Sequence, residues 1–249
     1  MKIIISPAKT MRDNDDGFSA ERTPLFLDEA NQLLKVLKNY SSEELSDLMK
    51  CNKKIAELNY DRFQRMKLNE AYMPALFSYD GLQYKSMAPH VFNDKEYKYI
   101  QEHLVILSGF YGMLRPDDAI RFYRLEMQTE LAVGKYKNLY EFWADKLYKE
   151  LYKENGLVIN LASKEYSKTI EPYLKESDRM IECVFGYLDK GKVKVKGTLA
   201  KMARGAMVRW MAENNVTDAS QLKQFTEQGF CFSKELSTDN EFIYIRQDS

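Results

Sequence analysis

The sequence has few of the residues on which most metal sites and nucleophilic enzymes depend. Among 249 residues it holds three cysteines, Cys51, Cys183 and Cys231, and two histidines, His90 and His103. The cysteines are far apart without CxxC spacing, which is typical of reduced thiols and excludes a disulfide framework or a zinc finger. Two histidines exclude a histidine-rich metal centre and disfavour a Ser-His-Asp triad. We therefore expect no bound metal and no cofactor, and any catalysis would use carboxylates, lysines, arginines or tyrosines.

The sequence also lacks a long apolar run and a net charge. No run approaches the roughly 20 residues that cross a bilayer, and the stretch before Pro7 is too short for a signal peptide. We therefore expect a cytoplasmic protein with no membrane contact and no stable protein partner. Thirty-seven basic residues balance 37 acidic ones. This balance argues against a surface coated with nucleic-acid-binding charge, but it is compatible with a local basic cleft.

Short apolar runs and stretches of helical spacing alternate along the chain, without a repeat or a linker. Strands are predicted at residues 2–5, 104–107, 157–161, 180–188, 192–196, 229–232 and 242–246. Helices are predicted from about residues 28, 42 and 52, and over 93–103, 138–154 and 198–213. Asp80-Gly81 predicts a hairpin within residues 76–84, and residues 11–24 an exposed loop. Together these elements predict a single domain over residues 1–249, of the mixed α/β (α+β) class, with a central mixed sheet flanked by helices.

The stretch from His103 to Met127 is the first candidate site. Its apolar run, residues 104–107, ends in a loop that contains Gly109 and Gly112. The following residues, 115–118, predict a turn and a helix start with a proline at the first helical position. Open sheets hold ligands where a strand ends in such a loop.

Three predicted strands, ending at Ile5, Leu107 and Leu161, each lead into a polar loop. If they lie parallel and adjacent, their loops share one edge of the sheet. The residues expected to converge on this crevice are Ser6, Lys9, Ser108, Gly109, Gly112, Arg115, Asn160, Ser163 and Glu165. The loop Ser6–Thr10 could hold an anion with its two hydroxyls and one ammonium. A polar turn with a solvated lysine is an equally good interpretation.

The segment 188–209 carries the strongest local charge of the chain. It holds seven basic residues against one acid, Asp189, a net charge of +6. On the predicted helix 198–213, Lys201, Arg204 and Arg209 lie opposite an apolar face. Such a surface would attract phosphates, although it could also be an ordinary solvated hairpin and helix face.

Arg124 and Glu126 also admit two interpretations. Arginine forks suit bidentate phosphate binding, yet both residues could join a buried ion-pair network. The second role is favoured for Glu126, because cations beside a carboxylate lower its pKa and make it a poor proton donor.

With these stretches in view, the chain resembles the YaaA peroxide-stress family of bacterial cytoplasmic proteins. The likeness extends from the first strand to the last third of the chain in several blocks of fixed order. The matching blocks are IISPAKT at 4–10, LSGFYGMLRPDD at 107–118, YRLEM at 123–127, LYEFW at 139–143, VINLASKEY at 158–166 and KMARGAM at 201–207.

The resemblance implies a single mixed α/β domain of the cantaloupe-like type. It also implies a role in limiting the damage that hydrogen peroxide causes with intracellular iron, and hence a link to iron homeostasis. It further implies binding of double-stranded DNA through a basic cleft and a helix-hairpin-helix element, for which Gly109 to Arg115 is the best match. The DNA- or anion-binding residues expected on this basis and from the charge pattern are Lys9, Arg115, Arg124, Lys201, Arg204 and Arg209.

Two functional hypotheses follow from the residues and the resemblance. The favoured one is a non-enzymatic, DNA-binding stress protein, although enzymatic activity is left open because no catalytic motif is recognisable. The alternative is an enzyme that acts on a nucleotide or nucleobase in the strand-end crevice. A groove wide enough for a duplex would favour DNA, whereas a closed pocket of a few hundred Å³ would favour an enzyme. Direct iron handling is disfavoured by the scarcity of histidine and cysteine.

Overall fold

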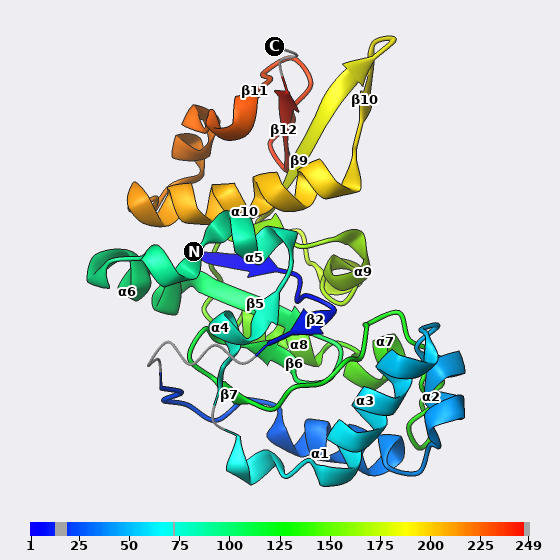
Figure 1. Ribbon diagram of the computed structural model, residues 1–249. Coiled ribbons are helices and arrows are strands. Elements are labelled where there is room, and N and C mark those ends of the chain that lie inside the picture. Colours follow the sequence, from blue (N-terminus) through cyan, green and yellow to red (C-terminus); the bar gives the residue numbers. More distant parts are fainter. Residues whose placement is uncertain (13–18, 72, 247–249) are drawn as a thin grey trace.

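The first strand of the chain lies near the centre of a mixed sheet (Figure 1). The computed structural model describes residues 1–12, 19–71 and 73–246. Strand β1 (Lys2–Ile5) is parallel to both of its neighbours, β5 (Leu104–Ser108) and β8 (Val158–Leu161). The prediction that these three strands lie parallel and adjacent is therefore confirmed, and their loops open at one edge of the sheet.

The rest of the sheet extends on both sides of these three strands in the order β11-β12-β9-β8-β1-β5-β6. The β8–β9 and β9–β12 pairs are parallel, whereas the β11–β12, β5–β6 and β9–β10 pairs are antiparallel. The remaining strands are β6 (Gly112–Leu114), β9 (Met180–Asp189), β10 (Lys192–Lys194), β11 (Phe230–Phe232) and β12 (Glu241–Arg246). Two small ladders join β2 (Thr10–Met11) to β4 (Tyr79–Asp80), and β3 (Met73–Pro74) to β7 (Ala119–Ile120).

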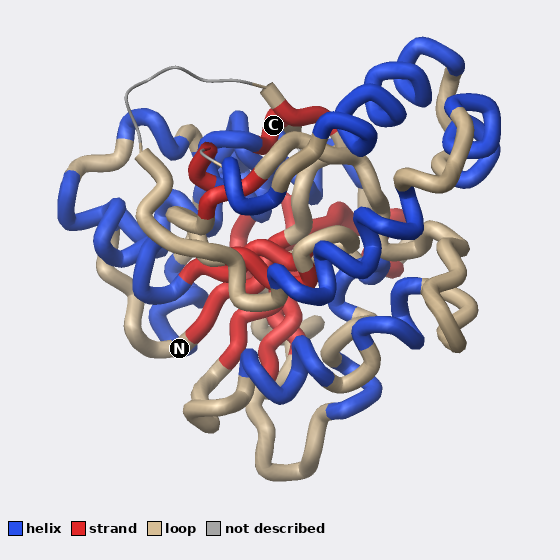
Figure 2. The backbone as a smooth tube through the Cα atoms, turned by 90° about the horizontal axis from the view of Figure 1, so that it is seen from below, coloured by secondary structure: helices blue, strands red, loops and turns tan. Residues whose placement is uncertain are grey.

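Helices surround the strands, as Figure 2 shows, so the predicted mixed α/β class is confirmed. One group near the N-terminus comprises α1 (Leu27–Leu37), α2 (Ser42–Leu48) and α3 (Lys53–Arg65). The other helices are α4 (Ala75–Ser78), α5 (Leu82–Met87), α6 (Asp94–His103), α7 (Leu139–Trp143), α8 (Lys146–Leu151), α9 (Lys164–Ser167) and α10 (Gly197–Glu213). Short 3-10 turns cover Leu68–Glu70, Pro89–Val91, Glu171–Tyr173, Ala219–Gln224 and Glu227–Gly229. No helix in the described ranges is long and apolar enough to cross a membrane.

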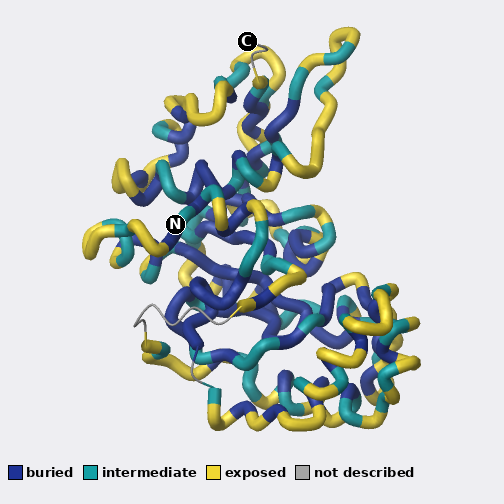
Figure 3. Tube along the Cα trace, viewed as in Figure 1, coloured by how far each residue is buried: buried dark blue, intermediate teal, exposed yellow. Residues whose placement is uncertain are grey.

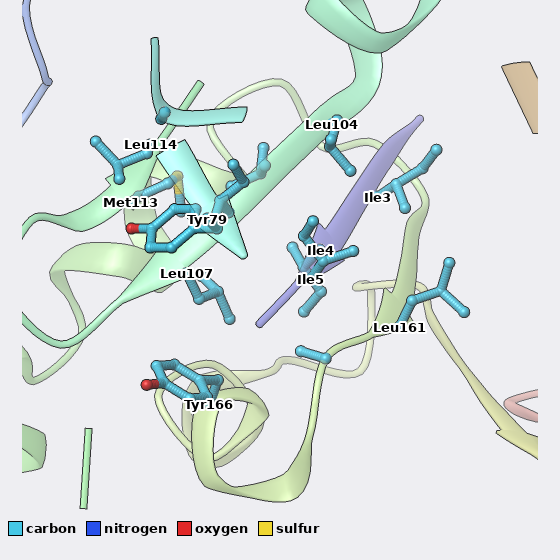
Figure 4. Close-up of a cluster of buried hydrophobic side chains, with 14 of the residues drawn as sticks. Ile3, Ile4, Ile5, Tyr79, Leu104, Leu107, Met113, Leu114, Leu161 and Tyr166 are labelled. Carbon is cyan, nitrogen blue, oxygen red and sulfur yellow. The ribbon is translucent and has the colours of Figure 1, made fainter. Parts of the chain in front are cut away.

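The central strands carry apolar side chains on both faces. Ile3, Ile4 and Ile5 are fully buried, as expected for a parallel strand with helices on both sides. Figure 4 shows these isoleucines with Leu104 of β5 and Leu161 of β8, and Figure 3 shows the same buried layer through the molecule. This rigid layer holds the loops at the carboxyl ends of the strands in fixed positions.

The predicted helix over 138–154 is wrong, because it is broken in the middle. Ala144 adopts φ 43° and ψ −130°, which ends α7 before α8 begins at Lys146. Trp143, just before the break, is fully buried and donates a hydrogen bond from Nε1 to the carbonyl oxygen of Gly109 at 3.0 Å. This tryptophan therefore belongs to the hydrophobic core.

The predicted hairpin at Asp80-Gly81 is also wrong. Gly81 has φ −167°, an extended conformation, whereas the tight hairpin turn requires a left-handed one. The glycine precedes α5 and comes so close to the loop after β1 that a Cβ atom would lie 2.9 Å from the Cβ of Ala8. Residues 115–118 form a turn and not a helix start. Of the predicted exposed loop 11–24, residues 13–18 lie outside the described residues, and Met11 is instead a buried residue of β2.

Candidate functional site

A pocket of about 310 Å³ opens at the carboxyl ends of β1 and β8. The loops after these two strands supply one side, and α5 and α10 supply another. The remaining wall is the extended segment that follows β7. The lining residues are Ser6, Pro7, Ala8, Lys9, Thr10, Asp80, Gly81, Leu82, Gln83, Tyr84, Tyr123, Arg124, Leu125, Glu126, Ser163, Glu165, Tyr166, Lys201 and Arg204.

Hydrogen bonds fix the two strand-end loops to each other. The Oγ of Ser6 accepts from the backbone N–H of Ser163 at 2.8 Å, and the two hydroxyls lie 3.1 Å apart. From α5, the hydroxyl of Tyr84 donates to the carbonyl oxygen of Ser6 at 3.0 Å. Because these bonds link three separate elements, the floor of the pocket is preorganised.

Many of the residues expected at the crevice line this pocket. The structure brings together Ser6, Lys9, Arg124, Ser163, Glu165, Lys201 and Arg204. Ser108, Gly109, Gly112, Arg115, Asn160 and Arg209 are not among the lining residues. Adjacency of the three strands thus predicted the place of the pocket and four of its 19 lining residues, Ser6, Lys9, Ser163 and Glu165.

Ser108 and the two glycines lie behind the pocket wall. The Oγ of Ser108 is 2.5 Å from the hydroxyl of Tyr123, a residue that does line the pocket. Gly109 packs so closely on the same wall that a Cβ atom would lie 2.5 Å from the carbonyl oxygen of Leu125. Gly112 has φ +71° beside the ring of Trp143. These residues support the site without reaching into it.

Gly109 to Arg115 does not form a helix-hairpin-helix element. The segment connects β5 to β6, which pair antiparallel from Ile106 with Leu114 to Ser108 with Gly112. The assignment of a hairpin between two helices to these residues is therefore corrected to a hairpin between two strands.

Two of the expected arginines are engaged elsewhere. Arg115 forms an ion pair with the buried carboxylate of Asp118 at 2.7 Å and donates to the carbonyl oxygen of Thr23 at 2.7 Å. Arg209 pairs with Glu213 one turn later on α10 at 2.7 Å. Both contacts stabilise local structure away from the pocket.

Asn160 is a structural residue at the end of β8. It is buried, and its Oδ1 accepts a hydrogen bond from the backbone N–H of Ala162 at 3.0 Å. This bond shapes the turn that delivers the Ser163–Tyr166 segment to the pocket.

Lys9, Arg124 and Glu126 form a three-membered ion cluster in the pocket wall. Both cations contact Glu126 Oε1 at 2.9 Å, and the Glu126 side chain is only 8% exposed. Burial raises the pKa of Glu126, but the hydrogen bonds from Arg124 and Lys9 lower it by more, so the pKa lies below its usual 4.5. The expected ion-pair network and the depressed pKa of Glu126 are therefore confirmed.

Glu165, which also lines the pocket, has the reverse shift. Burial is the main cause that raises its pKa, and the nearby negative charge of Glu126 adds to it. The hydrogen bond that its Oε1 accepts from the backbone N–H of Gln128, at 3.3 Å, opposes the shift without cancelling it. The pocket thus holds two carboxylates whose pKa values are shifted in opposite directions by their surroundings, a pattern that also occurs in acid–base catalytic sites.

Tyrosines form the part of the wall that the sequence argument missed. The hydroxyls of Tyr79 and Tyr123 lie 2.7 Å apart, and burial raises the pKa of Tyr123 to about 12. Burial also raises the pKa of Tyr166 and Tyr84 well above 10. These groups are neutral phenols at physiological pH, and Tyr84, Tyr123 and Tyr166 line the pocket with almost fully buried side chains. Tyr123 precedes Arg124 in YRLEM, and Tyr166 follows Glu165 in SKEY. The alternation of apolar and polar residues alone could not show that these two tyrosines face the pocket.

The cationic part of the pocket belongs to α10. Lys201 is exposed at the mouth, whereas Arg204, one turn later, is partly buried with a fully buried Nε. Burial lowers the pKa of Arg204, against the opposing influence of Glu182. A group of three or more His, Cys, Asp and Glu side chains able to hold a metal does not occur in the described ranges. The charged groups that are present suit an anionic organic ligand.

The fold and the pocket together place this protein in a class: α/β proteins whose ligand site lies at the carboxyl ends of parallel strands. The chain belongs to the peroxide stress protein YaaA family, whose model matches residues 1–236. This membership confirms the resemblance carried by the sequence blocks.

Relatives of similar length extend over almost the whole chain. A UPF0246 protein of Desulfitobacterium hafniense is 48% identical over 246 residues, which are 99% of this chain and 98% of the relative. UPF0246 proteins of Pediococcus pentosaceus and Lactiplantibacillus plantarum are 46% and 49% identical, over 100% and 99% of this chain and 99% and 100% of their own. These names do not specify an activity.

Proposed function

We propose that this member of the peroxide stress family acts through its pocket, as an enzyme on a nucleotide or nucleobase. The observation that supports this proposal is the pair of carboxylates, Glu126 and Glu165, that line one small pocket and have opposite pKa shifts. A volume of about 310 Å³ suits a small molecule and is too small for a duplex. The pocket therefore favours the enzymatic alternative over DNA as its ligand.

In this proposal the two carboxylates have separate roles. Glu165 gives or accepts a proton, because its raised pKa brings it closer to physiological pH. Glu126 stays ionised and holds Lys9 and Arg124 at fixed positions beside the ligand. The neutral phenols of Tyr123 and Tyr166 form part of the pocket wall without adding charge to it.

Cys51 and Cys183 are poorly suited to reduce peroxide directly. Burial raises the pKa of Cys51 and raises that of Cys183 to about 12. Peroxide reacts with thiolates, and these shifts keep both groups as thiols. The connection to peroxide stress would then be through the product or the substrate of the pocket.

Replacing Glu165 with glutamine should reduce turnover about 100-fold or more, because the variant cannot transfer a proton. The measurement is a screen of nucleosides, nucleotides and nucleobases with the purified protein, followed by mass spectrometry of the products. Glu154→Gln, at an exposed carboxylate on another element, is the matched control and should keep full activity. The proposal fails if the screen reveals neither turnover nor binding.

The second candidate function is binding of double-stranded DNA. Bound protein would shield the DNA and so limit iron-dependent damage. This function is supported by the arm, residues 187–196, formed by the end of β9, the turn and β10. The arm projects beyond the sheet in Figure 1 and carries exposed Lys190, Lys192, Lys194 and Lys196. Only one of these lysines pairs with an acid in the described structure, Lys194 with Asp189 at 3.5 Å.

Charge reversal of Lys190, Lys192 and Lys194 together should weaken duplex binding by at least about tenfold. It should also flatten the dependence of affinity on salt, because fewer counterions are released on binding. Fluorescence anisotropy with a labelled duplex at several salt concentrations measures both quantities.

The matched control reverses three exposed lysines on other elements, Lys35, Lys53 and Lys149. It changes the net charge by the same amount and should weaken binding far less. Equal losses in the two triple variants would show only a general charge effect and would contradict a role for the arm.

A further inference from the structure

We propose that the pocket binds a nucleoside 5′-monophosphate in one orientation. The phosphate lies against Lys201 and Arg204 of α10, and N–H donors of the base face Glu126. This inference rests on the proposed pocket function and names the ligand class and its polarity. It follows from two buried polar atoms in the pocket wall that the protein itself leaves without partners.

The first of these atoms is the Nε of Arg204. It is fully buried, and no hydrogen bond or ion pair joins this guanidinium to another of the described residues. A guanidinium whose Nε is buried without a hydrogen-bond acceptor is unfavourable in the empty protein, because the lost hydration of this N–H is not replaced. An anionic ligand group in the pocket that Arg204 lines would supply the missing partner.

The second cation of α10 makes a phosphate the better match than a carboxylate. Lys201 lies one turn before Arg204, lines the same pocket, and forms no ion pair within the described part of the chain. The other two cations of the pocket, Lys9 and Arg124, are already occupied by Glu126. Two free cations on adjacent turns of one helix suit a dianionic phosphate monoester, which accepts several charge-assisted hydrogen bonds.

The second unpartnered atom is the Oε2 of Glu126. Both cations of the ion cluster contact Oε1, and Oε2 is buried without a hydrogen bond. Because the pKa of Glu126 is lowered, this oxygen is an acceptor that requires a donor. A ligand that satisfies both ends of the pocket therefore carries a phosphate and N–H donors on one compact frame.

A nucleotide meets these conditions and fits the remaining walls. Its base offers N–H donors on a flat ring, and the side chains of Tyr123 and Tyr166 form part of the wall of the same pocket. The volume of about 310 Å³ is of the size that holds one small ligand. Guanosine 5′-monophosphate is the first probe, because its base presents adjacent ring and exocyclic N–H donors that a carboxylate can accept.

Isothermal titration calorimetry with guanosine 5′-monophosphate and guanosine tests the phosphate contact. The nucleotide should bind about 10- to 100-fold more tightly than the nucleoside, because only the nucleotide reaches the two cations of α10. Arg204→Met and Lys201→Met should each remove most of this advantage and leave guanosine binding nearly unchanged. Arg209→Gln, on the same helix but outside the pocket, should bind both probes as the unmodified protein does.

Thermal unfolding separates a ligand-binding role of Arg204 from a merely structural one. Because its charge has no partner in the empty protein, Arg204→Met should unfold at the same temperature or higher. Guanosine 5′-monophosphate should then raise the unfolding temperature of the unmodified protein clearly more than that of the variant at the same concentration. A clear loss of stability in Arg204→Met, with nucleotide affinity unchanged in both variants, overturns the inference.

The same experiments distinguish failure of this inference from failure of the proposed function. Equal affinity for nucleotide and nucleoside overturns the phosphate contact but leaves an enzyme acting on nucleosides or bases. A different outcome is turnover of another substrate that depends on Glu165, with no binding of guanosine 5′-monophosphate or adenosine 5′-monophosphate. That outcome overturns the nucleoside monophosphate as the ligand and leaves the enzymatic function of the pocket standing.

Discussion

Replacing Gly205 with alanine should destabilise the folded protein by about 3 kcal/mol or more. Gly205 lies where α10 crosses α5, and a Cβ atom there would stand 2.0 Å from the carbonyl oxygen of Gln83 and 2.9 Å from the Cβ of Ser86. The nearest obstacle is backbone and cannot rotate away as a side chain could. The two helices would have to separate, although alanine by itself favours a helix by about 1 kcal/mol over glycine.

The same change should disturb the pocket. Figure 1 shows α5 and α10 side by side over the sheet, and both helices contribute to the pocket wall. Separation of the helices would move Lys201 and Arg204 away from Gln83 and Leu82. Loss of ligand binding should therefore accompany the loss of stability in Gly205→Ala.

Gly197→Ala is the matched control for this prediction. Gly197 begins the same helix, and a Cβ atom there would have nothing within 4 Å. This variant should be as stable as the unmodified protein or up to about 1 kcal/mol more stable. Urea unfolding of both variants measures the difference, and equal stabilities would contradict the close packing of α10 on α5.

The central strands were predictable from the sequence because their signal is local and strong. The run Lys2–Ile5 is apolar, β-branched and ended by a proline, and the strands that neighbour it also end in polar loops. Parallel packing of such strands brings their carboxyl ends together, so the place of the pocket followed from residues far apart in the sequence.

The errors arose where tertiary contacts override local preference. Asp80-Gly81 is a strong turn signal, yet Gly81 is required by its close approach to Ala8 and not by a left-handed turn. The apolar stripe of 138–154 fits one helix, yet the fixed position of Trp143 against Gly109 coincides with a break at Ala144. Neither contact leaves a pattern in the sequence.

Helix α10 shows the same limit at the site itself. Helical spacing places Arg204 opposite the apolar stripe, which predicts a solvent-facing basic side chain. In the structure α5, α6 and β9 all contact this helix. Because several elements cover it, residues outside the predicted apolar face, such as Gly205 and Val208, are also buried. Arg204 faces the pocket instead of bulk solvent, and it is the covering of the helix by several elements that gives this residue its unusual environment.

Replacing Glu126 with glutamine should destabilise the protein by about 3 kcal/mol at neutral pH. The change removes the counter-charge of Arg124, whose side chain is only 12% exposed and cannot recover its hydration. Lys9 is 60% exposed and returns to water, so it contributes little to the loss. Glu57→Gln, at an exposed carboxylate paired with the exposed Lys53, is the matched control and should cost less than about 0.5 kcal/mol.

The effect of Glu126→Gln should depend on pH in one direction. Because the pKa of Glu126 in the folded protein is lower than its usual 4.5, the carboxylate stabilises the fold above that value. This stabilisation is lost as the pH falls through the lowered pKa, so the unmodified protein and the variant should converge in stability under acid conditions. Urea unfolding from pH 7 down to below 4.5 measures the two curves. A difference that stays constant over this range would mean that the cost comes from packing and not from the charge that Glu126 shares with Arg124 and Lys9.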